Sequence, residues 1–425
     1  MLETRTTLGL RRWVVLLVGC LGLVYFVIRG PMRAFQPGGN ADFHVVHNAQ
    51  KTFDAGKNPY LRQDTLDQAR HTPLHNFLWH YANGVLLYAP GFLVVFYPMG
   101  LAAATSAVWI WIVLELAAAG ALVYFAARLV DLHQSQWFVF LGASFFFAPI
   151  HTSISHGQPA IFFCVLTLAL FCYLKEQRKA AAALTLGLLM IKPSFGVPAV
   201  WIALARGGWR VPALAAVVAV ITWLPFLSRY GVVDGGQHYL SAIRDVQKPA
   251  GDADDSRENP FRFDLINLRS WLHSWNAPQL LTDGLNGLLL LGMAWALYRF
   301  RGSIGHDPGD TYYWVLAVVF PCLAVYHRFY DATILLVAVA AAIKLWETQR
   351  RAAITIGLLL LPFALPGTAY LNQTLDSGSV SEPWLEALVI RHQPPLILLA
   401  GFLSMFMLSR AGPFAPEAEG SNRRY

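Results

Sequence analysis

The stretch WVVLLVGCLGLVYFVI, residues 13–28, decides the fold class, because it holds sixteen consecutive residues without a charge. A helix spans the hydrocarbon core of a bilayer with about 20 predominantly apolar residues. Similar apolar runs recur along the 425-residue chain, of which 56% is hydrophobic and only 13% charged, whereas soluble domains carry about 25% charged residues. The sequence therefore predicts an all-α polytopic membrane protein.

The charges beside the apolar runs predict the orientation in the membrane. Arg11 and Arg12 precede the first run, and the positive-inside rule places such residues in the cytoplasm. Other basic clusters expected on this side lie at 205–210, 298–302, 344–351 and 421–425. The net charge of +7 comes from these short clusters between apolar runs, so no nucleic-acid partner is expected.

Two alternatives stay open for the crossings in the first half of the chain. Residues 84–127 are long enough for two crossings, and 180–205 would then form one. Alternatively, the first region crosses once and the second forms two short helices that meet at Lys192. The basic cluster at 175–179 favours the second alternative, because the cluster then lies in the cytoplasm. Either alternative gives about ten to twelve spans in one integral membrane domain, residues 1–425.

Two polar segments, residues 30–83 and 228–278, are too long to be simple connectors. Loops beyond about 15 residues are commonly functional or disordered. The aromatic residues and histidines at helical spacing predict that both are ordered external loops. In the first, the 3-4-3 spacing of an amphipathic helix is formed by Phe43, Val46, Gln50 and Phe53, and we expect this helix to lie on the membrane surface.

Asp42 stands at the start of this predicted helix, and two interpretations of it remain open. Aspartate is a preferred N-cap residue, which would give Asp42 a purely structural role. Alternatively, an external carboxylate at the lipid boundary is a candidate general base for a hydroxyl whose co-substrate is embedded in the bilayer.

Lys192, in LLMIKPSFG (188–196), is a lysine with about a dozen mostly apolar residues on each side. A lysine in mid-membrane costs about 2.5–3.5 kcal/mol on insertion scales, and such residues are functional candidates. Snorkelling to an interface is the structural alternative. We expect Lys192 to have no partner inside the protein and to bind a phosphate that reaches down from a lipid carrier.

Other polar residues at the ends of apolar runs are candidates for the same site. In VYHRFYD (325–331), His327 is a candidate acid or base and Arg328 a candidate phosphate ligand, although an aromatic belt with an ordinary turn explains the same residues. His156 and Gln158 begin a span, where a helix-start turn is the alternative. Arg269 in the second loop is a further candidate phosphate partner, or part of a solvated face.

The first external loop is rich in histidine but has no recognisable metal-ligand spacing. Five of the thirteen histidines of the chain fall in it: His44, His47, His71, His75 and His80. A metal site needs ligands that converge. We therefore predict no metal site and no cofactor, with a divalent metal possible but not required.

The ordered set of motifs resembles glycosyltransferase family 87 of the GT-C superfamily over residues 38–345. The motifs are ADFHVVHNAQKTFDAGKNPY (41–60), LLYAPGFLVVFYPMGLA (86–102), SHGQPAIFFCVLTLAL (155–170), AAALTLGLLMIKPSFGVPAVWIALARGGWR (181–210) and YHRFYDATILL (326–336). Around residue 73 the chain departs from the family pattern, because the usual paired prolines are spread out by an apparent insertion. This departure affects the expected acceptor site.

The resemblance implies a GT-C-type glycosyltransferase fold and a membrane enzyme that uses a polyprenyl-phosphate sugar, most commonly mannose. The sugar would pass with inversion to a lipid or glycan acceptor hydroxyl. By position in the motifs, Asp42 is the implied base and His327 a second catalytic residue, while Lys192 and Tyr60 contact substrate. The implied location is a bacterial inner membrane among membrane lipids, with the active site on the external, periplasmic face.

Two other functions are compatible with the same residues. A transporter or flippase of lipid-linked sugars would also keep a buried lysine and arginines, but the chain shows no internal repeat and has two large external loops. An oligosaccharide ligase or polymerase of the related GT-C type is the other alternative.

Overall fold

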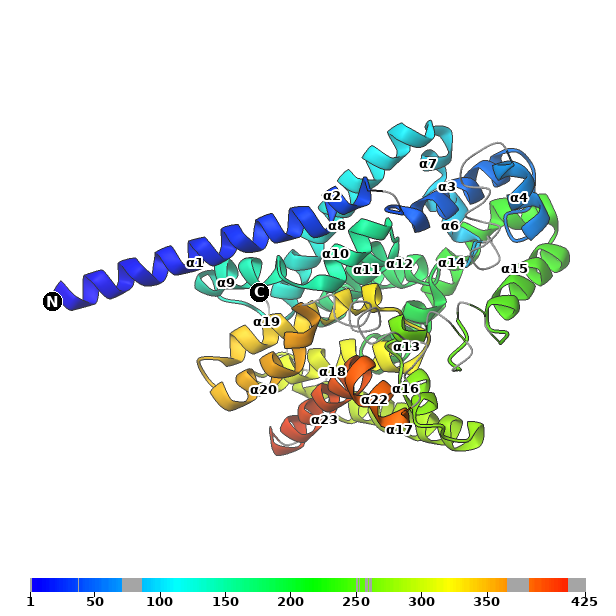
Figure 1. Ribbon diagram of the computed structural model, residues 1–425. Helices are drawn as coiled ribbons and strands as arrows, with labels where there is room; N and C mark the ends of the chain where they lie inside the picture. Colours follow the sequence, from blue (N-terminus) through cyan, green and yellow to red (C-terminus); the bar gives the residue numbers. More distant parts are fainter. Residues whose placement is uncertain are drawn as a thin grey trace.

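The apolar runs form helices in the computed structural model (Figure 1). The structure describes residues 2–36, 38–70, 86–249, 251, 253–256, 259, 262–364 and 382–411. Within these ranges there is no strand, and the only β pairing is an isolated antiparallel bridge between Leu265 and Arg328. The structure confirms an all-α polytopic membrane protein.

The helices follow one another along the whole described chain. In chain order they are α1 (Leu2–Arg29), α2 (Pro31–Ala34), α3 (Ala41–Asp54), α4 (Arg62–Ala69), α6 (Gly91–Val95), α7 (Tyr97–Leu101), α8 (Ala104–Leu129), α9 (Gln134–Ser144), α10 (Ala148–His156), α11 (Ala160–Lys175), α12 (Lys179–Leu189), α13 (Pro193–Gly207), α14 (Arg210–Tyr230), α15 (Val232–Val246), α16 (Leu268–Ser274), α17 (Gln279–Arg299), α18 (Gly309–Ala324), α19 (Leu336–Leu345), α20 (Arg350–Leu360), α22 (Pro383–Leu385) and α23 (Gln393–Ala411). Among the described residues, four short 3-10 helices are η1 (Arg262–Asp264), η2 (Arg301–Ser303), η3 (Phe329–Leu335) and η4 (Leu361–Ala364), and η5 (Glu386–Ile390) is a short π-helix.

Five of the described helices are long and apolar enough to cross a membrane, and a sixth span is possible if the bent pair α9 and α10 crosses once. The five are Leu16–Ala34, Ala104–Leu129, Arg210–Tyr230, Gln279–Arg299 and Gln393–Ala411. Helices α11, α12 and α18 are apolar but shorter. The number of about ten to twelve spans therefore stays a prediction.

The two regions that were ambiguous in sequence have the arrangement that the basic cluster at 175–179 favoured. Residues 84–127 contain one long helix, α8, preceded by the five-residue helices α6 and α7. Residues 180–205 form two helices, because α12 ends at Leu189 and Pro193 begins α13. Lys192 lies in the break between them.

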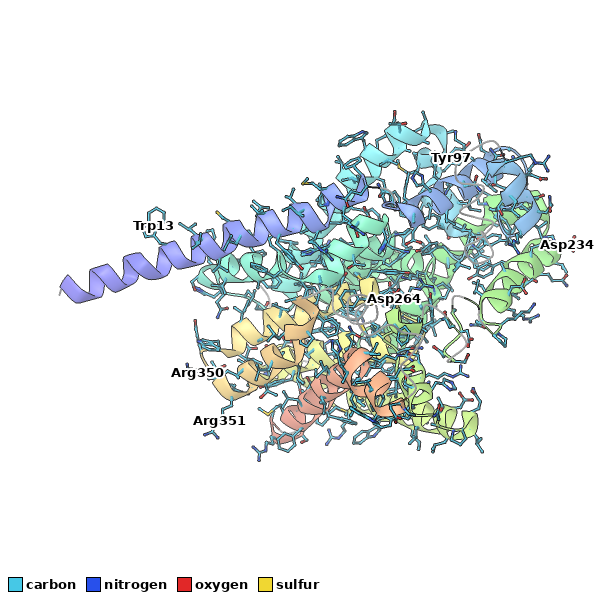
Figure 2. The ribbon with its side chains drawn as sticks, viewed as in Figure 1. Trp13, Tyr97, Asp234, Asp264, Arg350 and Arg351 are labelled. Atoms are coloured by element: carbon cyan, nitrogen blue, oxygen red, sulfur yellow. The ribbon has the colours of Figure 1, made fainter. Side chains whose placement is uncertain are left out.

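The interior of the bundle is built around α11 and α18. Helix α11 packs against α8 and α12, and α18 packs against α23. By contrast, the outer helices leave large apolar side chains uncovered: Leu280 of α17 is 86% exposed and Trp13 of α1 is 72% exposed. Figure 2 shows Trp13 pointing away from α1, which extends beyond the bundle. Such faces are suited to lipid contact.

Segments that are predicted on opposite sides of the membrane lie at opposite ends of the molecule. Asp234, in the second polar segment, lies far from Arg350 and Arg351 of the basic cluster (Figure 2). The N-terminus lies at the same end as those arginines (Figure 1). This separation agrees with the predicted orientation.

The first polar segment forms α2, α3 and α4, and its remainder at 71–85 lies outside the described residues. The amphipathic spacing in α3 is confirmed, since Phe43, Val46 and Phe53 are all buried. The apolar face of α3 packs against α4, α7 and α8, and the expected position of the helix on the membrane surface stays a prediction. The polar Gln50 is also fully buried, which shows that protein rather than lipid covers this face.

Candidate active site

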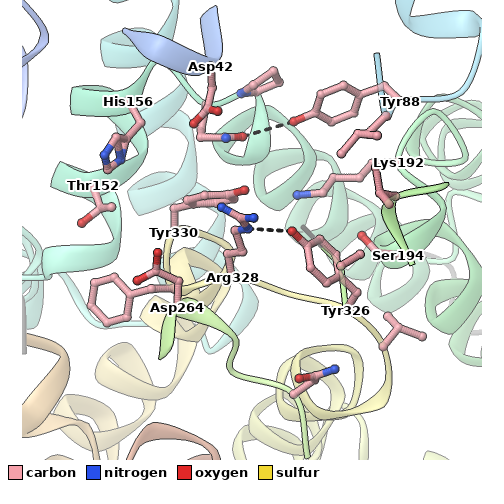
Figure 3. Close-up of a pocket in the computed structure, with 18 of the residues that line it drawn as sticks. Asp42, Tyr88, Thr152, His156, Lys192, Ser194, Asp264, Tyr326, Arg328 and Tyr330 are labelled. Atoms are coloured by element: carbon pink, nitrogen blue, oxygen red, sulfur yellow. Dashed lines mark hydrogen bonds between the residues drawn. The ribbon is translucent and has the colours of Figure 1, made fainter. Parts of the chain in front are cut away.

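A cavity of about 1510 Å³ lies between the first polar segment, the second polar segment and the loop before η3 (Figure 3). Six of the predicted site residues line it: Asp42, His156, Gln158, Lys192, Arg269 and Arg328. Tyr60 and His327 are not among the lining residues. The cavity therefore brings together most residues that sequence reasoning selected from separate segments.

Asp42 belongs to the first turn of α3 and is not its N-cap. The N-cap is Asn40, which has a left-handed φ of 54° and whose Nδ2 donates to the Ala34 carbonyl at 3.0 Å. Among the described residues, the Asp42 carboxylate has no hydrogen bond or ion pair, and it points into the cavity (Figure 3). The purely structural interpretation of Asp42 as a cap is therefore wrong.

Gly157 brings the end of α10 against the start of α3. Its φ of +66° is in the left-handed region, and a Cβ there would lie 2.6 Å from Phe43 Cβ. The backbone N–H of Asn40 donates to the Ser155 carbonyl at 2.9 Å across the same contact. Glycine is required for this approach, and it places His156 on the same cavity as Asp42.

Gln158 accepts a hydrogen bond from Tyr88, and Tyr60 in turn bonds to Tyr88 deeper in the protein. The Tyr88 hydroxyl donates to Gln158 Oε1 at 3.2 Å (Figure 3), and the Tyr60 hydroxyl donates to the Tyr88 carbonyl at 2.7 Å. Tyr60 is only 3% exposed. It therefore supports Tyr88 from behind, and its predicted contact with substrate has no direct counterpart in this geometry.

Lys192 forms an ion pair with Asp331, so the expectation that it has no internal partner is wrong. The side chains of Lys192 and Asp331 are 11% and 1% exposed. The Lys192 ammonium also lies 4.9 Å from the ring centroid of Phe195 and 5.7 Å from that of Tyr330. Because an ammonium carries three N–H donors, this pairing leaves capacity for a ligand.

Asp331 connects Lys192 to His327. His327 Nδ1 donates to Asp331 Oδ2 at 3.1 Å, and the backbone N–H of Arg328 donates to the same oxygen at 3.1 Å. Burial alone raises the pKa of Asp331, but the Lys192 charge and these contacts outweigh it and hold the pKa below its usual range. Asp331 is therefore an anion that neutralises and orients its neighbours.

His327 itself lies behind the cavity wall. Its ring is fully buried and lies edge-on to Phe195, with centroids 4.5 Å apart. Its Nε2 has no hydrogen-bond partner among the described residues. His327 is linked to the cavity only indirectly, because it bonds to Asp331, which pairs with the cavity-lining Lys192. The predicted catalytic role of His327 stays a prediction.

Arg328 and Asp264 bring opposite charges to the cavity. Arg328 Nε donates to the Tyr326 hydroxyl at 2.6 Å (Figure 3). Burial raises the pKa of Asp264, Arg328 and His156 oppose that rise, and the negative charge of Asp42 adds to it. These four charged or titratable groups therefore influence one another across a single pocket.

Arg269 lies in a different electrostatic environment from Arg328. Its guanidinium pairs with Asp283 at 3.0 Å and with Asp255 at 3.7 Å. A guanidinium between two carboxylates is poorly placed to attract a phosphate, so the geometry gives less support to Arg269 than to Arg328 as a phosphate ligand.

Several lining residues were not selected from the sequence. Arg29 is the last residue of α1 and Arg33 lies in α2. Tyr88, Asp264 and Tyr326 line the same cavity. The two arginines directly follow the first apolar run, a position that could have drawn attention to them. Asp264 is one of several polar residues in the second polar segment, and no spacing in the sequence distinguishes it.

The described residues contain no group of three or more histidine, cysteine, aspartate or glutamate side chains that could hold a metal ion. His44 and His47 lie on α3. Burial lowers the pKa of both rings, which keeps them neutral at pH 7. His71, His75 and His80 lie outside the described residues.

The fold and the cavity define a polytopic helical membrane protein with a charged pocket between its two polar segments. The model of glycosyltransferase family 87 matches residues 86–366, which is more than half of the chain. The chain belongs to glycosyltransferase family 87 and is a membrane glycosyltransferase. No curated protein and no solved structure matches it. The family match begins after Asp42 and Tyr60, so their roles depend on the geometry described above.

Proposed function

We propose that this glycosyltransferase moves a sugar, with mannose as the expected one, from a polyprenyl-phosphate donor to a lipid or glycan hydroxyl. In this proposal the reaction inverts the anomeric configuration, and Asp42 is the general base. The observation that carries it is the Asp42 carboxylate, which lacks a partner among the described residues and points into a cavity that also holds Lys192 and Arg328. A base needs such freedom to accept a proton.

The proposed step is a single displacement. The acceptor oxygen forms a bond to the anomeric carbon while its proton passes to Asp42. The bond between the anomeric carbon and the phosphate oxygen breaks at the same time, and the electron pair leaves on the polyprenyl phosphate. Attack on the face opposite the leaving group inverts the anomeric configuration.

Cations near the leaving group would stabilise the charge that develops on its phosphate. Lys192 and Arg328 line the cavity from the loop side, and Arg29 and Arg33 line it from the end of α1. Arginine suits phosphate because its planar guanidinium can donate two parallel hydrogen bonds. A lipid phosphate could approach beside α1, whose spanning window is only 17% buried.

The proposed reaction needs no cofactor, because the base and the phosphate ligands all come from the chain. A divalent metal is not required for it, so chelation with EDTA should leave transfer intact. We further propose that the site faces the external side of a bacterial inner membrane, where a translocated polyprenyl-phosphate sugar presents its head group.

The experiment that tests the proposal is Asp42→Asn, assayed by transfer of radiolabelled sugar from a polyprenyl-phosphate donor to a membrane acceptor extract. The change keeps the shape of the side chain and leaves the Asn40 cap untouched. General-base catalysis contributes about 10²- to 10⁴-fold, and we expect a loss of that order.

Asp54→Asn is the matched control, because Asp54 lies at the other end of α3, is exposed and does not line the cavity. It should transfer sugar at the wild-type rate. Full activity in Asp42→Asn would show that another group is the base.

A further inference from the structure

The cavity is lined by two chemically different sets of residues. Arg29, Lys192 and Arg328 supply cationic donors. The other set, which we call the amide wall, consists of Asp264, Asn267 and Asn286. Figure 3 shows Asp264 across the pocket from Asp42 and beside Arg328. The amide wall is not needed for the proposed chemistry at the donor phosphate, so its side chains require another explanation.

The amide wall presents hydrogen-bond acceptors. Asn267 is 2% exposed, and its Nδ2 donates to Asp255 at 2.7 Å. Because a carboxylate only accepts, the amide must turn its nitrogen toward Asp255 and its oxygen away from it. That buried oxygen has no hydrogen-bond partner among the described residues, and neither does the buried oxygen of Asn286. The Asp264 carboxylate has no hydrogen bond or ion pair with any described residue.

Asn286 lies on a polar stripe of a membrane-spanning helix. Gln279, Thr282 and Asn286 share one face of α17, with spacings of three and four residues. Leu280 and Leu288 on other faces of that helix are 86% and 69% exposed. Polar residues within a membrane span are costly and commonly functional. A buried amide oxygen without a partner costs further free energy, which a ligand donor would recover.

Little positive charge offsets the amide oxygens of Asn267 and Asn286, whereas Asp264 is influenced by Arg328 and His156. Arg269 lines the same cavity, but it is paired with Asp255 and Asp283. Burial lowers the pKa of His273, which keeps its ring neutral at pH 7. An anionic ligand at Asn267 and Asn286 would therefore meet amide oxygens with no compensating donor. A ligand rich in hydroxyl groups would donate to them.

From this arrangement we infer that the amide wall binds the sugar part of the acceptor, and that this acceptor is a neutral, polyhydroxylated glycan. The inference rests on the proposed function, because it assigns those lining residues that the proposed donor chemistry does not use. Hydroxyls of the acceptor would donate to the oxygens of Asn267, Asn286 and Asp264. A carboxylated or phosphorylated glycan would be rejected.

The test measures binding to the full-length protein in lipid nanodiscs, which avoids glycoside detergents. The probes are octyl glycosides of glucose, galactose and mannose, each compared with the octyl glycoside of the corresponding uronic acid. Farnesyl phosphate serves as a separate probe of the cationic lining residues. We expect at least one neutral glycoside to bind at least tenfold more tightly than its uronic acid counterpart.

Asn286→Leu removes one acceptor while keeping the size of the side chain on α17. Loss of one hydrogen bond of ordinary strength should weaken neutral glycoside binding about five- to tenfold. Farnesyl phosphate binding should stay at the wild-type value. Leu288→Ala is the matched control on the outer face of the same helix, and it should change neither.

The outcomes separate the inference from the proposed function. Equal or tighter binding of the uronic acids, or unchanged glycoside binding in Asn286→Leu, overturns the inference. Loss of farnesyl phosphate binding in Asn286→Leu also overturns it, because the amide wall would then belong to the donor site. If wild-type protein fails to bind farnesyl phosphate while it selects neutral glycosides, the proposed donor is wrong and the amide wall still binds a glycan.

Discussion

Removing the cation of the Lys192–Asp331 pair should lower the stability of the folded protein, because Asp331 would be left as an unbalanced charge. Lys192→Met keeps a long side chain at the break between α12 and α13 but leaves Asp331 without its ammonium. The Asp331 side chain is 1% exposed, so water cannot replace the lost partner.

The expected loss in the free energy of unfolding depends on the hydrogen bonds that Asp331 keeps. Breaking a buried ion pair by removing one partner costs about 3–5 kcal/mol, because an uncompensated charge is left in the interior. Asp331 retains two donors, His327 Nδ1 and the Arg328 N–H, both at 3.1 Å. We therefore expect the lower end, about 3 kcal/mol.

The pH dependence of stability gives a second signature. In the wild type, the Lys192 charge holds the pKa of Asp331 below its unfolded value, so this group weakens stability only when the pH falls below about 4. In Lys192→Met, burial should raise that pKa above the unfolded value. The variant should then recover part of its lost stability between pH 7.5 and pH 5, where the wild type changes little.

The assay is thermal and denaturant unfolding of purified protein at both pH values. Lys192→Met/Asp331→Asn removes both charges and should return to within about 1 kcal/mol of the wild type. Lys344→Met breaks the Lys344–Asp307 pair, whose aspartate side chain is 56% exposed, and should cost less than about 1 kcal/mol.

Two results would refute this reasoning. A single variant as stable as the wild type would mean that Asp331 does not depend on Lys192. A double variant no more stable than Lys192→Met would mean that lost packing, rather than unbalanced charge, causes the destabilisation.

Three further predictions concern catalysis, packing and orientation. His327→Gln should reduce sugar transfer less than about tenfold, because the ring lies outside the cavity and glutamine can still donate a hydrogen bond. If His327→Gln is inactive while Asp42→Asn is fully active, His327 is the base. Gly157→Ala should lower stability by about 1–3 kcal/mol, measured by unfolding, because its φ is +66°; a wild-type midpoint would contradict this. With Cys20 replaced, an impermeant thiol reagent should label Gln63→Cys but not Glu347→Cys in intact cells, and reversed labelling would place the cavity on the cytoplasmic side.

The sequence was most informative where local spacing determines structure. The positions of Phe43, Val46 and Phe53 predicted α3, and Pro193 predicted the break that separates α12 from α13. The same spacing could not show whether lipid or protein covers the apolar face of α3, because both favour the same side chains. That choice depends on α7 and α8, which no local pattern connects to α3.

Local sequence patterns could not show which residues contact the site residues. Lys192 and Asp331 are separated by 139 residues along the chain, so nothing beside Lys192 indicated its counter-ion. Asp264 appeared as one polar residue among several, and only the fold shows that it faces the cavity. Asp42 was identified because a carboxylate so close to an apolar run is unusual, and the structure then showed that Asn40 takes the role of the cap.

The isolated bridge between Leu265 and Arg328 has a consequence for exchanging parts between family members. The backbone N–H of Ile266 donates to the His327 carbonyl at 2.9 Å beside this bridge. The second polar segment and the loop before η3 are thus joined through their main chains, in register, at the cavity. A chimera that replaces only one of them would shift Arg328 against Asp264 even if it kept both of these side chains. Specificity transplants should therefore move residues 228–278 and 325–331 as one unit.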